Sequence, residues 1–477
     1  MQKFISKYGL AAHLAILAVA PLFLFPFCSG NAIANAVLWL SLFAAIWVLM
    51  EPSRRLDEML HDARLRVAGA IAKDPVFWLT VFLAAAAATA FANDGIAMAY
   101  DAENYVWKMS APAAEILPGS VAGSGYLPFA AAIALVVLLQ GCRHALGKAA
   151  RIAFLFVLSL AAGISAAIAA ILGLCGNGRI LALAACDLAD ASFCGFSYGL
   201  CFLAAICALP GMFERRWTKA MVFLPISLGG SALGLFLFAP ARVSSSFAMV
   251  AVLTLAVSLA YAGAKLSYSA APKCLIFCGF SLILPAVFVV LLLPEEMWQA
   301  KIAEYMVWTF STAETENVRA VLSGIASGAW SDNPWLGTGL GSFPLDIRFR
   351  ADAAAWAVLP PLQKTALDGW RQLLAERGII GAALFVSPLA LLAWTWFHRL
   401  AKAAIEAFGR SFHSFVRATN PVCWLGVAVV AIAAAGGFCD VSVLRPDATL
   451  IAWPLIAVSA SSFPIPKKNA DEETTEK

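Results

Sequence analysis

The sequence predicts an all-α membrane protein that crosses the bilayer many times. Of its 477 residues, 62% are hydrophobic and only 13% are charged, and the mean hydropathy is +0.82. Soluble domains average about 45–50% apolar and about 25% charged residues, so this composition excludes a soluble globular protein. The apolar runs approach the length of about 20 residues that a membrane helix needs. They lack the short alternating pattern of a transmembrane barrel.

About twelve apolar segments have a length suited to membrane helices. In order they cover residues 10–27, 33–50, 76–92, 124–141, 152–172, 198–212, 220–239, 247–263, 274–293, 379–397, 422–438 and 448–462. A second span follows the first too closely for the first to be read as a cleaved signal peptide. The segment from Cys175 to Phe196 is ambiguous, because Asp187 and Asp190 directly follow its apolar part, as in a re-entrant or interfacial piece. If it crossed the membrane fully, every later span would be inverted.

The distribution of positive charge orients these spans. With the N-terminus in the cytoplasm, the cytoplasmic loops hold most of the lysines and arginines, including Arg54, Arg55, Arg143, Lys148, Arg151, Arg215, Arg216, Arg399 and Lys402. This asymmetry fits the positive-inside rule with both termini in the cytoplasm. The expected organisation is an N-terminal transmembrane region (1–293), a large periplasmic loop (294–378), C-terminal spans (379–462) and a polar cytoplasmic tail (463–477). A loop this long is usually functional.

The cysteines and histidines do not indicate a metal site. Most of the 11 cysteines lie in or beside apolar spans, and Cys274 and Cys278 are expected to be buried small side chains. Cys175, Cys186 and Cys194 fall in one external loop, where the sequence leaves open whether two of them form a disulfide. The five histidines are scattered and lack the spacing of metal ligands. The sequence therefore predicts no metal and no cofactor.

The most conspicuous polar stretch runs from Trp330 to Gly381. Asn333-Pro334 ends a helix, and Gly337, Gly339 and Gly341 then alternate in a tight turn. No Gly-Lys-Ser/Thr follows and no strand precedes the turn, so it is not a nucleotide loop. Two interpretations stay open: the glycines let a loop fold back between helices, or their amide groups receive an anion such as a phosphate.

Two arginines are candidates for binding such an anion. Arg242 lies at the outer junction of two spans, and Arg319 lies shortly before the glycine turn. The planar guanidinium matches phosphate oxygens with two donors, although a single arginine at a membrane surface is more often snorkelling or salt-bridged. Two arginines on one external face indicate a lipid-linked pyrophosphate.

These motifs together resemble the O-antigen ligase and O-antigen polymerase superfamily. The similarity lies in Arg319 to Gly324, Trp330, Asn333-Pro-Trp-Leu-Gly-Thr-Gly-Leu-Gly-Ser-Phe343 and Leu373-Leu-Ala-Glu-Arg-Gly-Ile-Ile-Gly381, in that order. Arg242, in Ala241-Arg-Val, is similar to a Ser-Arg-Gly element of the family. Asp440 lies in a segment that resembles an external turn before the last span. The resemblance covers residues from about 193 to 462.

The resemblance implies a metal-independent inverting glycosyltransferase with a GT-C-like fold. Its substrate would be an undecaprenyl-pyrophosphate-linked glycan, transferred at the periplasmic face to another glycan, to lipid A core or to another acceptor. Arginines and backbone donors would stabilise the leaving pyrophosphate. It implies catalytic roles for Asp368, Arg319, Arg242 and Glu376, and substrate-binding roles for Arg242, Arg319, Gly337, Gly339, Gly341, Trp370, Arg377 and Asp440. Membrane lipids and polysaccharide-assembly proteins are the expected partners, and nucleic acid is not.

The sequence departs from the family at the acceptor position. Members usually carry a His-Asn pair shortly before the Glu-Arg-Gly element, whereas this chain has Leu367 and Asp368 there. Asp368 is therefore the expected acceptor-side base, with help from Lys364 or Glu376; its alternative role is an N-cap for the following helix. Phe196-Ser-Tyr-Gly199 likewise replaces an asparagine-containing element. A non-catalytic glycan-lipid-binding protein and a lipid or polysaccharide transporter stay as alternatives.

Overall fold

The computed structural model describes most of the chain after residue 148. The described parts are residues 148–174, 188–239, 241–265, 270–292, 313–339, 342–359, 366–407 and 420–437, two strands near residue 100, and isolated positions between and beyond these. Everything said below about structure concerns these residues. The predicted spans at 10–27, 33–50 and 124–141 lie outside them, as do nearly all of 76–92 and most of 448–462.

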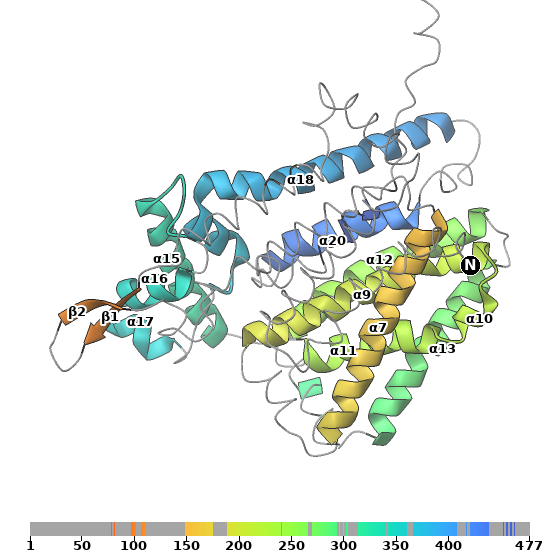
Figure 1. Cartoon of the computed structure of the whole chain (residues 1–477), viewed down its shortest axis with the longest axis horizontal. Helices are drawn as coiled ribbons and strands as arrows, with labels where there is room; N and C mark the ends of the chain where they lie inside the picture. Colours follow the sequence, from red (N-terminus) through yellow and green to blue (C-terminus); the bar gives the residue numbers. More distant parts are fainter. Residues whose placement is uncertain are drawn as a thin grey trace, which may run out of the picture.

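Long apolar helices run side by side and form a bundle (Figure 1). They are α7 (Lys148–Leu174), α9 (Leu188–Glu214), α11 (Gly230–Phe238), α12 (Ala241–Lys265), α13 (Ala270–Leu292), α18 (Gly369–Ala407) and α20 (Pro421–Gly437), with the short α10 (Thr218–Met221) and a π-helical turn η2 (Pro225–Gly229) before α11. Each of these long helices falls on a predicted span. The described part of the chain is therefore an all-α bundle with one exception, given below.

Four of these helices are long and apolar enough to cross a membrane. They are Lys148–Ile168, Phe196–Glu214, Ser244–Lys265 and Gly369–Lys402, with shorter apolar helices at Pro225–Phe238, Ala271–Val287 and Pro421–Ile432. These lengths and compositions show a membrane-embedded helical protein.

Helix α9 is the centre of the bundle. Every residue from Phe196 to Met212 is buried, and the helix packs against α7, α11, α12 and α20. Gly199 allows this close packing, because a Cβ there would overlap the ring of Phe247. The neighbouring Tyr198 contacts α7, where its hydroxyl lies 3.1 Å from the Ser165 hydroxyl. Phe196 to Gly199, which replaces a family element, thus lies in the core of the bundle. The residues from Leu188 onward already belong to α9, so the last part of the ambiguous segment is helical, ahead of the candidate span that begins at Phe196.

A charged cluster joins helix ends at one end of the bundle. The Glu214 carboxylate, at the end of α9, accepts a hydrogen bond from Lys148 Nζ at 2.6 Å and lies 3.3 Å from Lys265 Nζ. The beginning of α7 and the ends of α9 and α12 therefore lie together. Because α7 begins where α9 and α12 end, α7 runs in the opposite direction to these two helices, as the charge pattern of the sequence predicts.

The exception to the all-α prediction is a β-hairpin. Strand β1 (Ala97–Asp101) pairs antiparallel with β2 (Val106–Ser110), with Ala97 opposite Ser110 and Asp101 opposite Val106. It lies in the predicted external loop before the span at 124–141. Tyr100, Val106 and Trp107 are residue types that favour strands, and the helical periodicity sought along the chain does not detect so short a pair.

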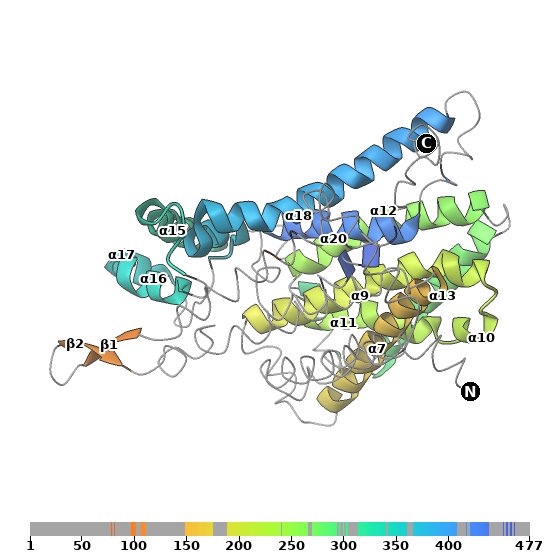
Figure 2. The same cartoon turned by 45° about the horizontal axis from the view of Figure 1, so that its top comes forward.

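The predicted periplasmic loop contains a second, smaller group of helices. α15 (Ala313–Asp332), α16 (Phe343–Arg350) and α17 (Ala353–Val358) lie beyond one end of the bundle, with the hairpin beyond them (Figures 1 and 2). Their own apolar core includes Leu322, Phe343, Ile347 and Ala375. Because Ala375 belongs to α18, this group, called the helical cap below, is joined to the bundle through that helix.

The cysteines behave as predicted where the structure describes them. Cys274 and Cys278 are buried free thiols, as are Cys201, Cys207 and Cys423. The side chains of Cys175, Cys186 and Cys194 lie outside the described residues.

Candidate functional site

The glycine turn is hydrogen-bonded, backbone to backbone, to a break in α18. Thr338 and Gly339 donate their amide protons to the carbonyl oxygens of Ala375 and Glu376, at 2.8 and 2.9 Å. In the other direction, Ile379 and Ile380 donate to the carbonyls of Pro334 and Trp335, at 2.8 and 3.2 Å. The break lies at Gly378, whose φ of 61° and ψ of −168° interrupt the helix. We call this pairing of the turn with the break the clasp.

Two glycines make the clasp possible because each approaches the other backbone closely. Gly337 has a φ of 72°, and a Cβ on it would overlap the backbone of Glu376 and Arg377. A Cβ on Gly378 would in turn overlap the backbone of Trp335 and Leu336. Only glycine combines these dihedral angles with this approach. The structure thus gives Gly337 and Gly378 a conformational role.

The clasp also uses amide groups that were candidates for anion binding. The Gly337 amide donates to Asn333 O at 2.9 Å, and those of Thr338 and Gly339 donate to α18. The fold-back interpretation of the turn is therefore confirmed for its described part. Direct binding of an anion by Gly337 or Gly339 stays a prediction, and Gly341 lies outside the described residues.

Arg319 lies on α15 and reaches Leu367, two residues before α18 begins. Its Nε and Nη2 both donate to the carbonyl oxygen of Leu367, each at 3.3 Å. Leu367 has a φ of 53°, a conformation that a leucine rarely adopts. The arginine thus holds a strained turn whose next residue, Asp368, is the predicted acceptor-side base.

Asp368 is the N-cap of α18. Its Oδ1 accepts hydrogen bonds from the amides of Trp370 and Arg371, both at 3.2 Å, and its Oδ2 lies 3.4 Å from Arg371 Nε. The cap role weighed from the sequence is therefore confirmed. A base role stays a prediction, and it would have to coexist with these contacts.

Glu376 and Arg377 are buried about two turns further along α18. They are 6% and 5% exposed, respectively, which is low for adjacent charged residues. Glu376 Oε1 accepts a hydrogen bond from Gln372 Nε2 at 2.9 Å, and Gln372 Oε1 accepts one from the Ala366 amide at 3.0 Å. A polar chain thus runs from the turn before α18 to Glu376. Gln372 did not stand out in the sequence, because only the fold shows that it joins these two segments.

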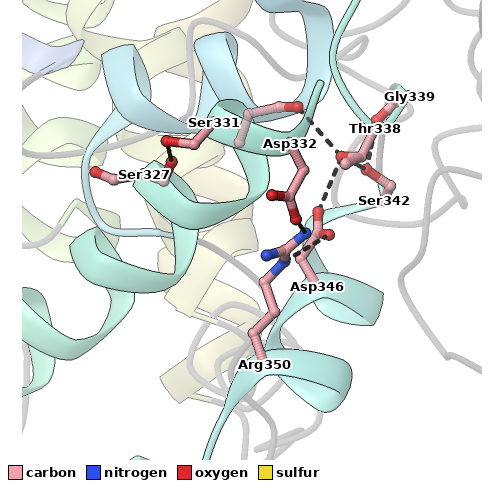
Figure 3. A network of polar contacts seen from close by, with 9 residues as sticks. Ser327, Ser331, Asp332, Thr338, Gly339, Ser342, Asp346 and Arg350 are labelled. Carbon is pink, nitrogen blue, oxygen red and sulfur yellow. Dashed lines mark hydrogen bonds and ion pairs between the residues drawn. The ribbon is translucent and has the colours of Figure 1, made fainter. Parts of the chain in front are cut away.

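A second polar network lies beside the clasp (Figure 3). Thr338 Oγ1 lies 2.9 Å from Asp346 Oδ2 and 2.6 Å from Ser342 Oγ, while Arg350 contacts Asp332 at 2.7 Å and Asp346 at 3.7 Å. Burial raises the pKa of the Asp346 carboxyl, and the Thr338 hydroxyl and the Arg350 guanidinium partly oppose that increase. The sequence analysis missed this network. Its only signal was an Asp and an Arg four residues apart on one short helix.

The structure brings together some of the predicted site residues and leaves others undescribed. Arg319, Gly337, Gly339, Asp368, Trp370, Glu376 and Arg377 lie within the helical cap and the first turns of α18, where the Trp370 ring packs edge-on against Phe385 at 6.0 Å. Arg242 lies in the first turn of α12, and its side chain is not among those described. Gly341, Lys364 and Asp440 also lie outside the described residues. Across the described part, no three His, Cys, Asp or Glu side chains are grouped to hold a metal ion.

The fold and site define a multi-helix membrane protein with a helical cap clasped onto one of its long apolar helices. No protein-family model matches the chain, and no curated protein matches it. The resemblance seen in the motifs therefore enters below as a proposal.

Proposed function

We propose that the protein transfers or polymerises undecaprenyl-pyrophosphate-linked oligosaccharide at the periplasmic face of the bacterial inner membrane. In this proposal it is a polysaccharide or O-antigen polymerase with about twelve spans, a GT-C-like fold and both termini in the cytoplasm. It would work as a metal-independent inverting glycosyltransferase. Polysaccharide-assembly proteins are its proposed partners.

One observation supports this proposal most directly. Arg319, the glycine turn and the buried Glu376–Arg377 pair come from separate parts of the sequence, and they meet where an apolar helix begins. Charged residues at such a place are costly unless they serve a purpose, and intramembrane or interfacial charges are default candidates for function. A lipid-linked pyrophosphate would reach this level, because its headgroup lies at the membrane surface while its chain stays in the bilayer.

The chemistry assigns complementary roles to the charges. As the glycosidic bond to the carrier breaks, negative charge develops on the pyrophosphate, and Arg319 together with Arg242 would stabilise it without a metal. The acceptor hydroxyl attacks the anomeric carbon from the opposite face and loses its proton to a base. Asp368 is the proposed base, and Glu376 would assist through its bond with Gln372.

Two further functions remain candidates. The confirmed cap role of Asp368, with no histidine before it, favours a non-catalytic protein that binds the glycan lipid within an exopolysaccharide complex. An O-antigen ligase that uses lipid A core as acceptor would use the same donor site, and the structure favours neither acceptor.

The test uses purified full-length protein in vesicles with undecaprenyl-pyrophosphate-linked repeat units. Longer glycan on the lipid is expected from the wild type; glycan on added lipid A core would support ligation instead. Arg319→Ala should form less than about one-hundredth of the product, since one preorganised charge contact is worth about 2.7–4 kcal/mol in the transition state. Arg348→Ala, an exposed arginine on α16, is the matched control and should keep full activity.

Because Arg319 also holds the Leu367 carbonyl, its replacement can lower the amount of folded protein. The amount of product is therefore divided by the amount of folded protein, which is measured by size-exclusion chromatography. Wild-type product from both Arg319→Ala and Arg242→Ala would overturn the pyrophosphate role.

A further inference from the structure

An apolar stripe runs along the outward side of α18 after the break. Ile379, Ala383, Val386, Ala390, Trp394 and Phe397 are all exposed and follow one another at intervals of three or four residues. Residues at this spacing lie on one face of a helix. On a helix long and apolar enough to cross a membrane, such a face is suited to contact with lipid, and it is called the lipid-facing stripe below.

The clasp places two more exposed apolar side chains at the beginning of this stripe. Trp335 and Leu336 are 65% and 69% exposed, respectively, and they occupy the tip of the turn. Their backbone is held directly on the helix, because Ile380 donates to Trp335 O and Ile379 donates to Pro334 O. The exposed side chains of the turn are therefore continuous with the lipid-facing stripe, although they belong to the helical cap.

The distance between the two aromatic ends of the stripe fits a bilayer. Trp394 and Phe397, whose rings lie 6.3 Å apart, follow Ile380 by about four to five helical turns, or about 21–26 Å at about 1.5 Å per residue. The hydrocarbon core of a bilayer is about 30 Å thick, and tryptophans concentrate at both of its surfaces. His398 and Arg399 directly follow the second pair, as expected at the opposite surface.

We propose that Trp335 and Leu336 insert into the lipid surface beside the start of α18 and anchor the helical cap to the membrane. The partner is the bilayer itself, at the boundary between headgroups and acyl chains. Trp335 suits this boundary because the apolar part of its indole lies among acyl chains while its N–H meets headgroups and water. Glu376 and Arg377 adjoin the same turn through the clasp. The anchor therefore holds these two residues at the level of the lipid headgroups.

Exposure alone would not support this inference. Trp356 on α17 is also exposed, at 44%, yet α17 packs against α15, away from the turn that is hydrogen-bonded to α18. What distinguishes Trp335 is its backbone attachment to α18 at the first exposed residues of that stripe. Trp356 is therefore a matched control of the same residue type.

The experiment places a photoreactive benzoylphenylalanine at position 335 or, separately, at 356 of the full-length protein. The protein is reconstituted in vesicles of phosphatidylethanolamine and phosphatidylglycerol that carry a radiolabelled phospholipid, and then irradiated. The expected result is at least about a fivefold higher yield of protein-linked lipid from position 335, as expected for a side chain at the acyl-chain boundary. Equal lipid yields from the two positions would overturn the proposal, as would attachment of position 335 mainly to a second copy of the chain.

A second pair of variants covers the case in which the probe disturbs the turn. Trp335→Phe keeps an apolar ring, whereas Trp335→Asp brings a charge to the proposed boundary; the side chain at this position is largely exposed, so neither variant disrupts packing. We expect the aspartate variant, and not the phenylalanine variant, to speed proteolysis of the helical cap in vesicles several-fold, with no difference between the two in detergent. Equal proteolysis of the two variants in vesicles would contradict an anchor. Neither lipid crosslinking nor proteolysis involves glycan transfer. A failure of the anchor would therefore leave the proposed function untouched, and a failure of the proposed function would leave the anchor untouched.

Discussion

Replacing the two clasp glycines by alanine should release the turn from α18. For Gly378→Ala, the dihedral angles of φ 61° and ψ −168° lie in a region essentially restricted to glycine, which costs about 1–3 kcal/mol. The new Cβ would also overlap the backbone of Trp335 and Leu336, and such overpacking costs a further 1–3 kcal/mol, roughly. If the turn moves away instead, each of the four interbackbone hydrogen bonds lost costs about 0.5–1.5 kcal/mol.

We therefore expect Gly378→Ala to destabilise the clasp by about 2–6 kcal/mol. Gly337→Ala should cost somewhat less, because a φ of 72° in the left-handed region costs an alanine about 1–2 kcal/mol before the overlap is counted. The assay is limited proteolysis between Asn333 and Ser342 on detergent-purified protein, combined with thermal unfolding followed by tryptophan fluorescence. Both variants should be cut faster and melt earlier than the wild type.

Gly324→Ala is the matched control for these variants. Gly324 lies in α15, and a Cβ there would meet no atom within 4 Å. Since alanine is favoured over glycine in a helix by about 1 kcal/mol, this change should be neutral or stabilising. If all three variants were cut and melted alike, the interlocking of Gly337 with Gly378 would be refuted.

Three further predictions concern the polar residues of the site. Asp368→Ala should cost about 1 kcal/mol of stability, while Asp368→Asn, an equally good N-cap, should be neutral in thermal unfolding; undiminished glycan length in the Asn variant would exclude the base role. Burial raises the pKa of the Asp346 carboxyl above its ordinary value of 3.8, because folding disfavours the ionised form. The stability that protonated Asp346 contributes is therefore fully present below pH 3.8 and is lost as the pH rises through the raised pKa of the folded protein. The wild type should therefore lose stability relative to Asp346→Asn from about pH 3 upward in chemical denaturation, and a constant difference would contradict the burial effect. Arg319→Lys should fail to restore product, since one ammonium cannot match the two donors that reach the Leu367 carbonyl; full rescue by lysine would mean that only the charge matters.

The sequence was sufficient to predict the helical bundle because its signals are local. Apolar runs of membrane length predicted the helices of the bundle but not α15, and the burial of Cys274 and Cys278 followed from their position within one of those runs. The fold-back of the glycine turn was also one of two interpretations that residue types alone supported. The hairpin β1–β2 was missed, since two strands of this length leave little periodic signal.

The clasp could not be predicted because it depends on contacts between distant residues. The sequence placed the beginning of a span at Ile379, whereas α18 begins at Gly369 and is interrupted at Gly378. Nothing local marks Gly378 as a break, since its dihedral angles are set by the turn that packs on it. The Arg319–Leu367 contact likewise joins residues 48 positions apart. These long-range contacts turned a set of motifs into a candidate site.

The most direct test of the proposed function is to follow the carrier lipid itself. Purified wild-type protein in vesicles is incubated with undecaprenyl-pyrophosphate-linked repeat units, and the lipid products are analysed by mass spectrometry. Glycan transfer predicts free undecaprenyl pyrophosphate in equal number to the new linkages, with longer glycan on the remaining lipid or on the acceptor. Intact donor after incubation, with neither free carrier nor extended glycan, would contradict it.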